Sequence, residues 1–297
     1  MNKTLTRRGS LALFALVILC WGLNWPVAKL LVQSVSPLWM VTIRSAIALV
    51  VLFFLALATR SLRVPRRGDL PVIFNIALLH MTGFAILMAI GLLHVSAGRS
   101  IVLGFTTPLW VIPGAILFLG ERITPKRSAG MVLGLGGLAL LFNPLALDWT
   151  DERALFGNGL LMLAALCWAI SIVHLRGHKW ISTPYQLVFW EVLVATAVLA
   201  LLAAGYEGYP RVDWDASLVL LFLYAGVFGV ALAYWAMATV SRSVPAMTVS
   251  LGMLATPLVG MTAAILFLGE PFSPMLALAQ ATIIAGIVLG TVNFGRR

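Results

Sequence analysis

Residues 107–125 read TPLWVIPGAILFLGERITP, and residues 256–274 read TPLVGMTAAILFLGEPFSP. The two stretches lie 149 positions apart and are identical at eleven of nineteen positions without a gap, including the run Ala-Ile-Leu-Phe-Leu-Gly-Glu. Unrelated apolar sequences share far fewer positions, so the chain is a duplication. Each copy predicts an apolar helix that begins at Thr-Pro and ends at Gly-Glu. The number of helices between the copies decides whether the two halves have the same or the opposite orientation in a membrane.

The composition is that of an integral membrane protein. Hydrophobic residues make up 61% of the chain and charged residues 10%, with a mean hydropathy of +1.03, whereas soluble domains carry about 25% charged residues. An apolar run of about 20 residues spans the ~30 Å hydrocarbon core of a bilayer as a helix. The sequence predicts ten such helices, at about residues 10–32, 38–59, 70–93, 96–119, 128–147, 157–176, 184–204, 216–240, 244–268 and 274–294.

The net charge of +10 is divided between the two sides of the membrane, which argues against a nucleic-acid partner. With a cytoplasmic N-terminus, fifteen of the twenty Lys and Arg residues lie on cytoplasmic segments, and seven of the ten acidic residues lie outside. This positive-inside bias favours ten helices with both termini in the cytoplasm. Five helices per copy then put Glu121 at the cytoplasmic face and Glu270 at the outer face.

We therefore expect an all-α integral membrane fold of ten transmembrane helices, arranged as two inverted five-helix repeats at residues 1–147 and 148–297. A second correspondence supports this division, because Leu-Cys-Trp-Gly at 19–22 resembles Leu-Cys-Trp-Ala at 166–169. Inverted repeats are typical of transporters, in which the halves exchange conformations and open a central site to either side in turn. The alternative is that duplication only built a stable bundle, as in some channels and membrane enzymes.

These motifs carry a family resemblance. Both halves contain Thr-Pro, an apolar run, Leu-Gly-Glu, a further Pro and a glycine-rich last helix, and the first helix contains Cys-Trp-Gly-Leu-Asn-Trp-Pro at residues 20–26. Over nearly the full chain this pattern resembles the drug/metabolite transporter superfamily in its ten-helix EamA-type form. The length and the aromatic-rich first helix are most similar to the bacterial aromatic amino acid exporters.

The resemblance implies a multi-pass protein of a bacterial cytoplasmic (inner) membrane that exports amino acids or other small metabolites. It also implies a substrate cavity between the third, fourth, eighth and ninth helices and their neighbours. The expected partners are therefore a small-molecule substrate and the lipid bilayer.

Polar side chains deep inside a predicted span are the first candidates for a substrate site, because they are costly in lipid and usually face a cavity or a partner. His80 lies about ten residues into the third predicted span, and Glu191 is the only carboxylate inside an apolar run. His80 either lines the cavity or hydrogen-bonds to a neighbouring helix. Glu191 carries protons or binds a substrate ammonium, or else it pairs with Lys179 or His178 at the inner face.

Aromatic and polar residues recur at corresponding positions of the first and sixth spans. Trp21 and Asn24 lie on one helical stripe, and Trp168 and Ser171 occupy the matching positions in the second half. We predict that these four residues line the cavity, where the indole rings would stack on an aromatic or aliphatic cargo. The alternative is that both tryptophans face lipid.

The fourth span completes the predicted substrate site with Ser100, Thr107 and Pro108. Thr-Pro within apolar sequence marks a kink with a hydroxyl group beside it. Close helix packing is the alternative reason for small residues in this span.

Three basic residues lie near predicted outer ends of spans, namely Lys29, Arg44 and Arg99. Their side chains are expected either to reach the lipid headgroups or to attract a carboxylate to an outer vestibule.

Signals for other chemistry are absent from the sequence. It contains no Walker motif, so ATP is not expected as the direct energy source, and neither Cys20 nor Cys167 has a partner at metal-ligand spacing. We therefore predict no enzyme, no cofactor and no metal site. The competing classes are a membrane enzyme, which needs clustered acids, His or Arg at one depth, and a channel or lipid flippase.

The sequence thus predicts an alternating-access exporter of aromatic and other neutral amino acids, with another metabolite or drug class as the alternative cargo. Coupling stays open: His80 and Glu191 could carry protons, whereas downhill export from a cytoplasmic excess of cargo needs no ion. The sequence predicts no particular oligomeric state.

Overall fold

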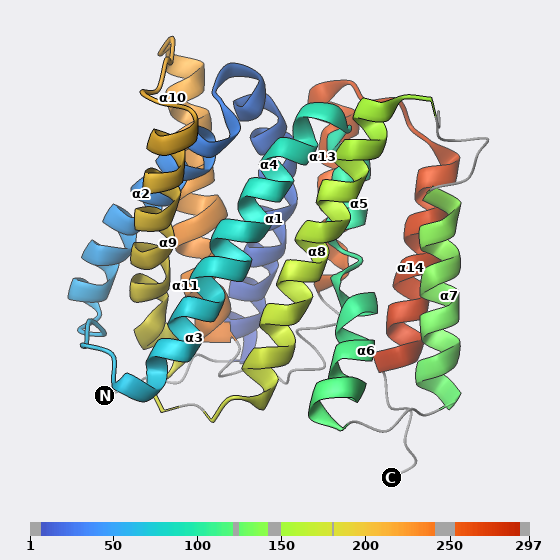
Figure 1. Cartoon of the computed structure of the whole chain (residues 1–297), viewed down its shortest axis with the longest axis horizontal. Helices are drawn as coiled ribbons and strands as arrows, with labels where there is room; N and C mark the ends of the chain where they lie inside the picture. Colours follow the sequence, from blue (N-terminus) through green and yellow to red (C-terminus); the bar gives the residue numbers. More distant parts are fainter. Residues whose placement is uncertain (1–6, 121–124, 142–149, 180, 241–252, 292–297) are drawn as a thin grey trace.

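A computed structural model describes residues 7–120, 125–141, 150–179, 181–240 and 253–291. All regular structure within these ranges is helical, and the helices form one bundle (Figure 1). In the first half they are α1 (Arg7–Ser34), α2 (Pro37–Ala58), η1 (Arg67–Asp69), α3 (Leu70–Asn75), η2 (Ile76–Phe84), α4 (Ala85–His94), α5 (Ala97–Gly104), α6 (Thr107–Leu119) and α7 (Pro125–Leu141). In the second half they are α8 (Glu152–Gly177), α9 (Pro184–Tyr206), α10 (Ala216–Leu223), η3 (Tyr224–Leu232), α11 (Ala233–Val240), α13 (Ala255–Leu268) and α14 (Pro274–Thr291).

Among the described residues, seven helical segments are long and apolar enough to cross a membrane, and three further apolar helices are shorter. Where predicted and observed boundaries can be compared, they agree within a few residues. The predicted end of the fifth span, the predicted start of the ninth span and the boundary between residues 147 and 148 lie outside the described residues.

The third and eighth predicted spans differ from the uninterrupted helices that the sequence indicates. Each contains a nine-residue π-helix, η2 in the third span and η3 in the eighth. The two π-helices begin at Ile76 and Tyr224, which are 148 positions apart in the duplicated sequence. π-helices are frequent at functional sites. Their matched positions therefore make the third and eighth spans candidates for the walls of such a site.

Proline and short polar side chains start the helices as their chemistry predicts. Proline lies in the first turn of α2 and of α9, where the missing N–H has no helical partner in any case. Asp151 accepts hydrogen bonds from the backbone N–H groups of Arg153 and Ala154, and Asp215 accepts one from Leu218. These caps satisfy donors that would otherwise be unpaired.

Both copies of the duplicated motif end in the same backbone geometry. Gly120 ends α6 and Gly269 ends α13, each with φ of 65°, a left-handed conformation that costs glycine little and other residues more. Within the motif, Ala115 and Ala264 are buried against other helices. The identical residues of the motif therefore pack and end helices.

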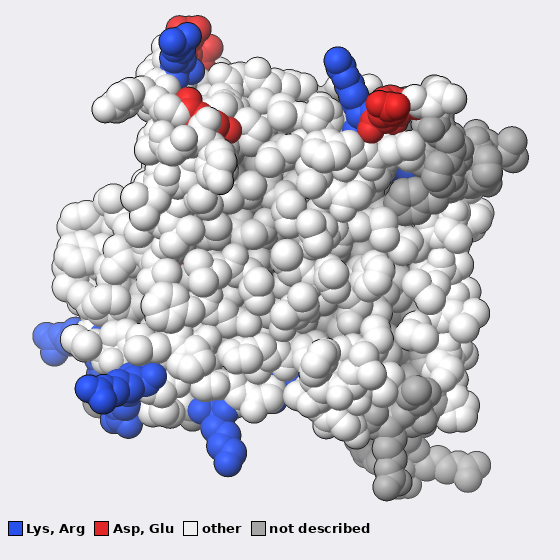
Figure 2. All heavy atoms as spheres, in the orientation of Figure 1, with Lys and Arg blue, Asp and Glu red and all other residues white. Residues whose placement is uncertain are grey.

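Large apolar side chains cover the outside of the bundle. The motif's Phe118 and Phe267 are 79% and 71% exposed, and the leucines before them are exposed as well. Figure 2 shows an uncharged band across the face drawn, with acidic and basic side chains together at the upper end and only Lys and Arg at the lower end. An apolar surface of this extent is what a multi-pass protein presents to lipid.

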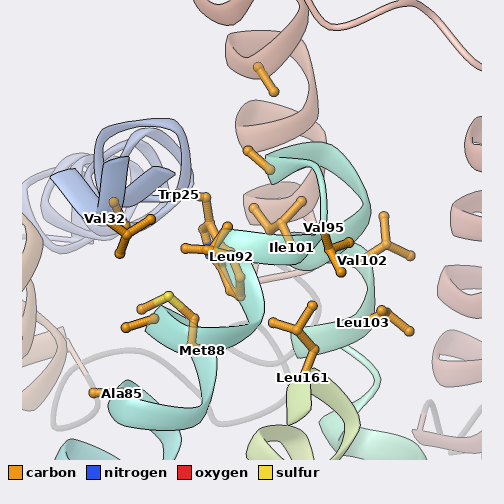
Figure 3. Packing of buried hydrophobic residues seen from close by; sticks show 14 of the residues in the cluster. Trp25, Val32, Ala85, Met88, Leu92, Val95, Ile101, Val102, Leu103 and Leu161 are labelled. Carbon is orange, nitrogen blue, oxygen red and sulfur yellow. The ribbon is translucent and has the colours of Figure 1, made fainter. Parts of the chain in front are cut away.

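The helices pack in pairs that join distant parts of the sequence. α2 lies against α9, α1 against α13, α8 against α4 and α6, and α7 against α14. The main core is shown in Figure 3, where Trp25 and Val32 of α1 lie beside Met88 and Leu92 of α4 and Ile101 of α5. This core holds α1 close to the third span and so fixes one wall of the central cavity.

Three carboxylates tie helix starts to other segments of the chain. Glu270 accepts hydrogen bonds from the backbone N–H groups of Ala97 at 2.6 Å and Gly98 at 2.9 Å, at the start of α5. Glu207 does the same at the start of α2, and Asp69 binds the backbone N–H and the hydroxyl of Ser182 just before α9. Each acid thus lies at the positive end of a helix dipole. Glu121, the counterpart of Glu270, lies outside the described residues.

Replacing Glu270 by Ala should lower stability, because two backbone donors lose a charge-assisted acceptor. We expect a loss of about 1–3 kcal/mol, measured as a lower melting temperature of the purified protein in detergent. Asp213 is an exposed acid in the segment before α10, so Asp213→Ala is the matched control. Equal melting temperatures for the two variants would contradict the role assigned to Glu270.

Candidate functional site

A cavity lies in the middle of the bundle, between α1, α2, the third span, α8, α9 and the eighth span. Its volume is about 90 Å³, several times what one water molecule needs. Phe105, between α5 and α6, adds one side chain from the fourth span. The cavity thus has walls from both halves of the sequence. In contrast to the expected position, no residue of α13, the described part of the ninth span, lines it.

His80 lies at the centre of an aromatic cluster in this cavity. Its ring stacks on the indole of Trp168, with centroids 5.0 Å apart and planes 9° from parallel. Its Nε2 lies 3.3 Å from the hydroxyl of Tyr234 on α11. Phe84 packs edge-on against both His80 and Trp168. The result is a wall of ring faces and edges with one polar contact, the His80–Tyr234 hydrogen bond.

The π-helix η2 positions this cluster. His80, Met81 and Phe84 all belong to η2 and all line the cavity. These three side chains share the side of η2 that faces the cavity, while η2 also packs against α8 and α9.

The opposite wall depends on a close approach of α1 to η3. A Cβ atom added to Gly229 would lie 2.3 Å from Oδ1 of Asn24, far inside van der Waals contact. Trp21 lies one turn earlier on α1 and packs edge-on against Tyr234 at a centroid distance of 5.6 Å. Glycine at position 229 therefore lets Asn24 and Trp21 reach the cavity.

Four of the predicted site residues line this single cavity: His80, Trp21, Asn24 and Trp168. The sequence placed Trp21 and Trp168 at corresponding positions, but their surroundings differ. Trp168 stacks on His80, whereas Trp21 contacts Tyr234. That these four residues bind a substrate stays a prediction.

The other predicted residues lie behind the cavity wall. Ser171 donates a hydrogen bond to Oδ1 of Asn75 at 2.6 Å, which ties α8 to the third span. Thr107 is buried and donates to the carbonyl oxygens of Gly104 and Ala165. Ser100 is fully buried, and Pro108 follows Thr107 in the first turn of α6. These positions support the wall and do not line the cavity in this conformation.

Glu191 is buried in α9 and does not line the cavity. Among the described residues, its Oε1 atom has no hydrogen-bond partner. Lys179, one of the two partners expected for it, has an exposed side chain. On α9, Glu191 is followed directly by Val192, which does line the cavity.

Arg44 was expected near the outer end of its span, either to reach the headgroups or to attract a carboxylate. Arg44 is 7% exposed and lines the cavity beside Ser45. Lys29 instead donates to the carbonyl oxygens of Leu92 and Val95, and Nε of Arg99 donates to Asn158. Counting residues from a span's predicted end gives membrane depth, but it does not show which face of the helix meets a cavity.

Several lining residues were missed from the sequence. Tyr234, Phe84 and Phe105 are aromatic residues in apolar spans, and composition alone does not distinguish them from lipid-facing rings. For Arg44 a signal was present, because a charged residue well inside a predicted span is a functional candidate by default.

The lining of the cavity is mainly aromatic and apolar, with few polar groups. Within the described ranges, no group of three or more His, Cys, Asp or Glu residues is arranged to hold a metal ion. The lining combines aromatic rings, apolar side chains, one imidazole and one guanidinium. Such a set suits a small amphipathic molecule held by stacking and a few polar contacts.

Replacing Gly226 of η3 by Ala should strain the contact between η3 and α2, because a Cβ atom there would lie 2.6 Å from Cβ of Ile47 and 2.9 Å from the carbonyl oxygen of Arg44. Neither atom can rotate away. Overpacking of this kind costs about 1–3 kcal/mol, so the melting temperature should fall. Gly159→Ala is the control, since a Cβ atom there meets nothing within 4 Å and Ala at a helical position is favoured by about 0.5–1 kcal/mol. An unchanged melting temperature for Gly226→Ala would contradict the close packing of η3 against α2.

Comparison with known proteins gives a consistent result. A model described as the EamA-like transporter family matches residues 8–143 and again residues 155–292. The uncharacterized transporter YoaV of Bacillus subtilis is 25% identical over 95% of this chain and 96% of its own length. A probable amino-acid metabolite efflux pump of Escherichia coli is 26% identical over 97% of this chain and 95% of its own.

A solved crystal structure is similar over 96% of this chain and 97% of its own length, with a TM-score of 0.67 and 20% identity. At that identity, the likeness shows the fold alone.

Proposed function

Because the chain belongs to the EamA-like transporter family of the drug/metabolite transporter superfamily, we propose that it exports amino acids through the central cavity. Aromatic and other neutral amino acids are the favoured cargo. The observation that carries this proposal is the aromatic cluster of His80, Trp168, Phe84 and Tyr234 around a buried space. Rings of this kind bind an aromatic or aliphatic side chain by stacking and burial.

A relative supports the substrate class. The Escherichia coli protein, similar over almost the whole of both chains, is named as a probable amino-acid metabolite efflux pump. At 26% identity the substrate of one protein does not transfer by itself. The cavity supports the same substrate class independently, because its aromatic rings and the Arg44 guanidinium suit an amphipathic cargo.

Transport by alternating access is the second part of the proposal. We assign two inverted five-helix repeats, residues 1–147 and 148–297, making ten membrane spans in all. The proposal is supported by the double match to the family model and by the π-helices 148 positions apart. In Figure 1, α6 and α13, which hold the two motif copies, run in opposite directions across the bundle. Exchange of conformation between such halves would move the cavity opening from one side to the other.

The orientation follows from charge. Lys and Arg gather at the end of the bundle that carries the segment between α2 and η1 (Figure 2). By the positive-inside rule, this end faces the cytoplasm, so both termini would be cytoplasmic in a bacterial inner membrane. Cargo would then leave at the end where Glu207 and Glu270 cap their helices.

Replacing Trp168 by Ala, or His80 by Ala, should impair transport, because each removes one face of the stacked pair. We expect at least a roughly tenfold lower transport efficiency, equivalent to about 1.4 kcal/mol. The assay is counterflow of radiolabelled phenylalanine in proteoliposomes. The control is Phe54→Ala, which removes a ring that is 63% exposed on the lipid side. Unsaturable flux, or absence of any amino acid flux in the unmodified protein, would overturn the proposal.

We further propose that Glu191 couples export to protons, since its Oε1 atom is buried and unpartnered. A proton gradient directed opposite to the cargo should accelerate flux in the unmodified protein. Glu191→Gln cannot exchange a proton, so its flux should not respond to the gradient. Flux that ignores the gradient in both proteins would leave downhill export as the mechanism.

A further inference from the structure

Arg44 is a buried cation without a partner. It lies on α2 with 7% of its surface exposed, and within the described part of the chain it makes no hydrogen bond and no ion pair. Its guanidinium nitrogens are not closed off by protein, and the side chain lines the central cavity. A guanidinium withdrawn from bulk water is costly unless an anion or several acceptors face it. The described residues provide neither.

The packing around α2 fixes Arg44 at this place. A Cβ atom added to Gly226 of η3 would lie 2.9 Å from the carbonyl oxygen of Arg44 and 2.6 Å from Cβ of Ile47. On the other side, the hydroxyl groups of Ser45 and Thr196 hydrogen-bond at 2.7 Å and join α2 to α9. The backbone of α2 at Arg44 is thus held between η3 and α9, and the Arg44 side chain lines the cavity.

The duplicated sequence gives Arg44 an equivalent position in the second half. Arg44 and Glu191 are 147 positions apart, the same offset that relates Pro37 to Pro184 at the starts of α2 and α9. The two halves therefore carry opposite charges at equivalent positions, and both side chains are buried. They do not form an ion pair with each other, and Arg44 alone of the two lines the cavity.

Arg44 also lies near the aromatic cluster. Tyr234 is close enough to Arg44 for the guanidinium charge to act on its hydroxyl, and that hydroxyl lies 3.3 Å from Nε2 of His80. One molecule can therefore contact the guanidinium with one end and the His80–Trp168 stack with the other. The cavity is polar and cationic on the α2 side and aromatic on the η2 side.

We propose that Arg44 binds the carboxylate of the cargo, and that the protein thereby selects molecules with a carboxylate at one end and an apolar group at the other. This inference rests on the proposed export function and specifies its substrate. A carboxylate matches the guanidinium in shape, since two parallel N–H groups meet two oxygens. A single cation matches the single charge of a carboxylate, whereas a phosphate dianion would need further cations, and Arg44 is the only Lys or Arg that lines the described cavity.

The test compares three small molecules that share a benzyl group: phenylalanine, its amide, which lacks the carboxylate, and 3-phenylpropionate, which lacks the ammonium. Binding to the purified protein is measured by calorimetry, and transport is measured by counterflow in proteoliposomes. In the unmodified protein, both acids should bind about tenfold or more tightly than the amide. Arg44→Met keeps an unbranched apolar side chain but removes the guanidinium, and it should bind acid and amide within about threefold of each other.

Two further variants separate recognition from folding. Arg44→Lys keeps the charge but loses the paired donors, so it should restore part of the preference for the acids. Arg153→Met removes an exposed arginine at the start of α8 and should leave that preference intact. Melting temperatures identify any variant that fails to fold, and in that case the Arg44→Lys comparison decides.

The outcomes also separate this inference from the proposed function. If phenylalanine is transported but Arg44→Met still prefers acid to amide, the inference is wrong and the export function stands. An unmodified protein that binds the amide as tightly as the acid would likewise overturn it. If no amino acid is transported but 3-phenylpropionate binds and Arg44→Met abolishes that binding, the export function fails and the carboxylate site stands.

Discussion

The bundle depends on one constraint: inside a bilayer, every backbone N–H and C=O group must find its partner within the protein. Helices satisfy most of these groups, but their ends do not. The structure meets the remaining need with carboxylates that reach across the sequence, as Glu270 does at the start of α5 and Glu207 at the start of α2. These contacts satisfy the helix ends and also fix which helices are neighbours. The central cavity is a consequence of that arrangement, because its walls come from helices held at both ends.

The same constraint explains how the cavity obtains polar groups. An interruption of a helix in lipid must keep its hydrogen bonds, and a π-helix does so while redirecting side chains. The segment η2 brings His80 and Phe84 to the cavity, and η3 places Gly229 where α1 needs room. Both segments lie in the middle of long apolar stretches. The binding chemistry is thus placed without exposing backbone groups to lipid.

Much of this architecture can be predicted from the sequence. Long apolar runs predict helices because only helices and closed barrels satisfy the backbone in lipid, and the observed helices follow those runs closely. His80 and Trp168 could be predicted to line a cavity, because polar side chains deep in a span usually face a cavity or a partner and the Trp168 motif is repeated in the first span. The direction of a side chain was not predictable. The π-helices shift the register within a span, so a helical wheel drawn through residues 70–93 places residues on the wrong faces.

For Arg44, sequence reasoning left two roles open. Its place near a predicted outer end allowed either a headgroup contact or the attraction of a carboxylate, and the structure shows that its side chain lines the cavity. The correspondence between the two halves would have been the better guide, because Arg44 and Glu191 occupy equivalent positions in the duplicated sequence. Charged side chains are costly inside a membrane and usually have a function there. Opposite charges at equivalent buried positions therefore indicate a function beyond holding the bundle together.

The identical and the differing positions of the two halves therefore have separate roles. Identical residues such as Gly120 and Gly269, or Phe118 and Phe267, end helices or face lipid, functions that both halves must perform. Differing residues make the cavity asymmetric: the position of His80 is taken by Phe228 in the second half, and that of Arg44 by Glu191. Inverted repeats can exchange conformations only if their packing is alike, whereas a cargo with two unlike ends needs walls that are unlike. In this sequence, packing residues are identical in the two halves and cavity residues differ between them. The packing can therefore be alike while the cavity walls are unlike.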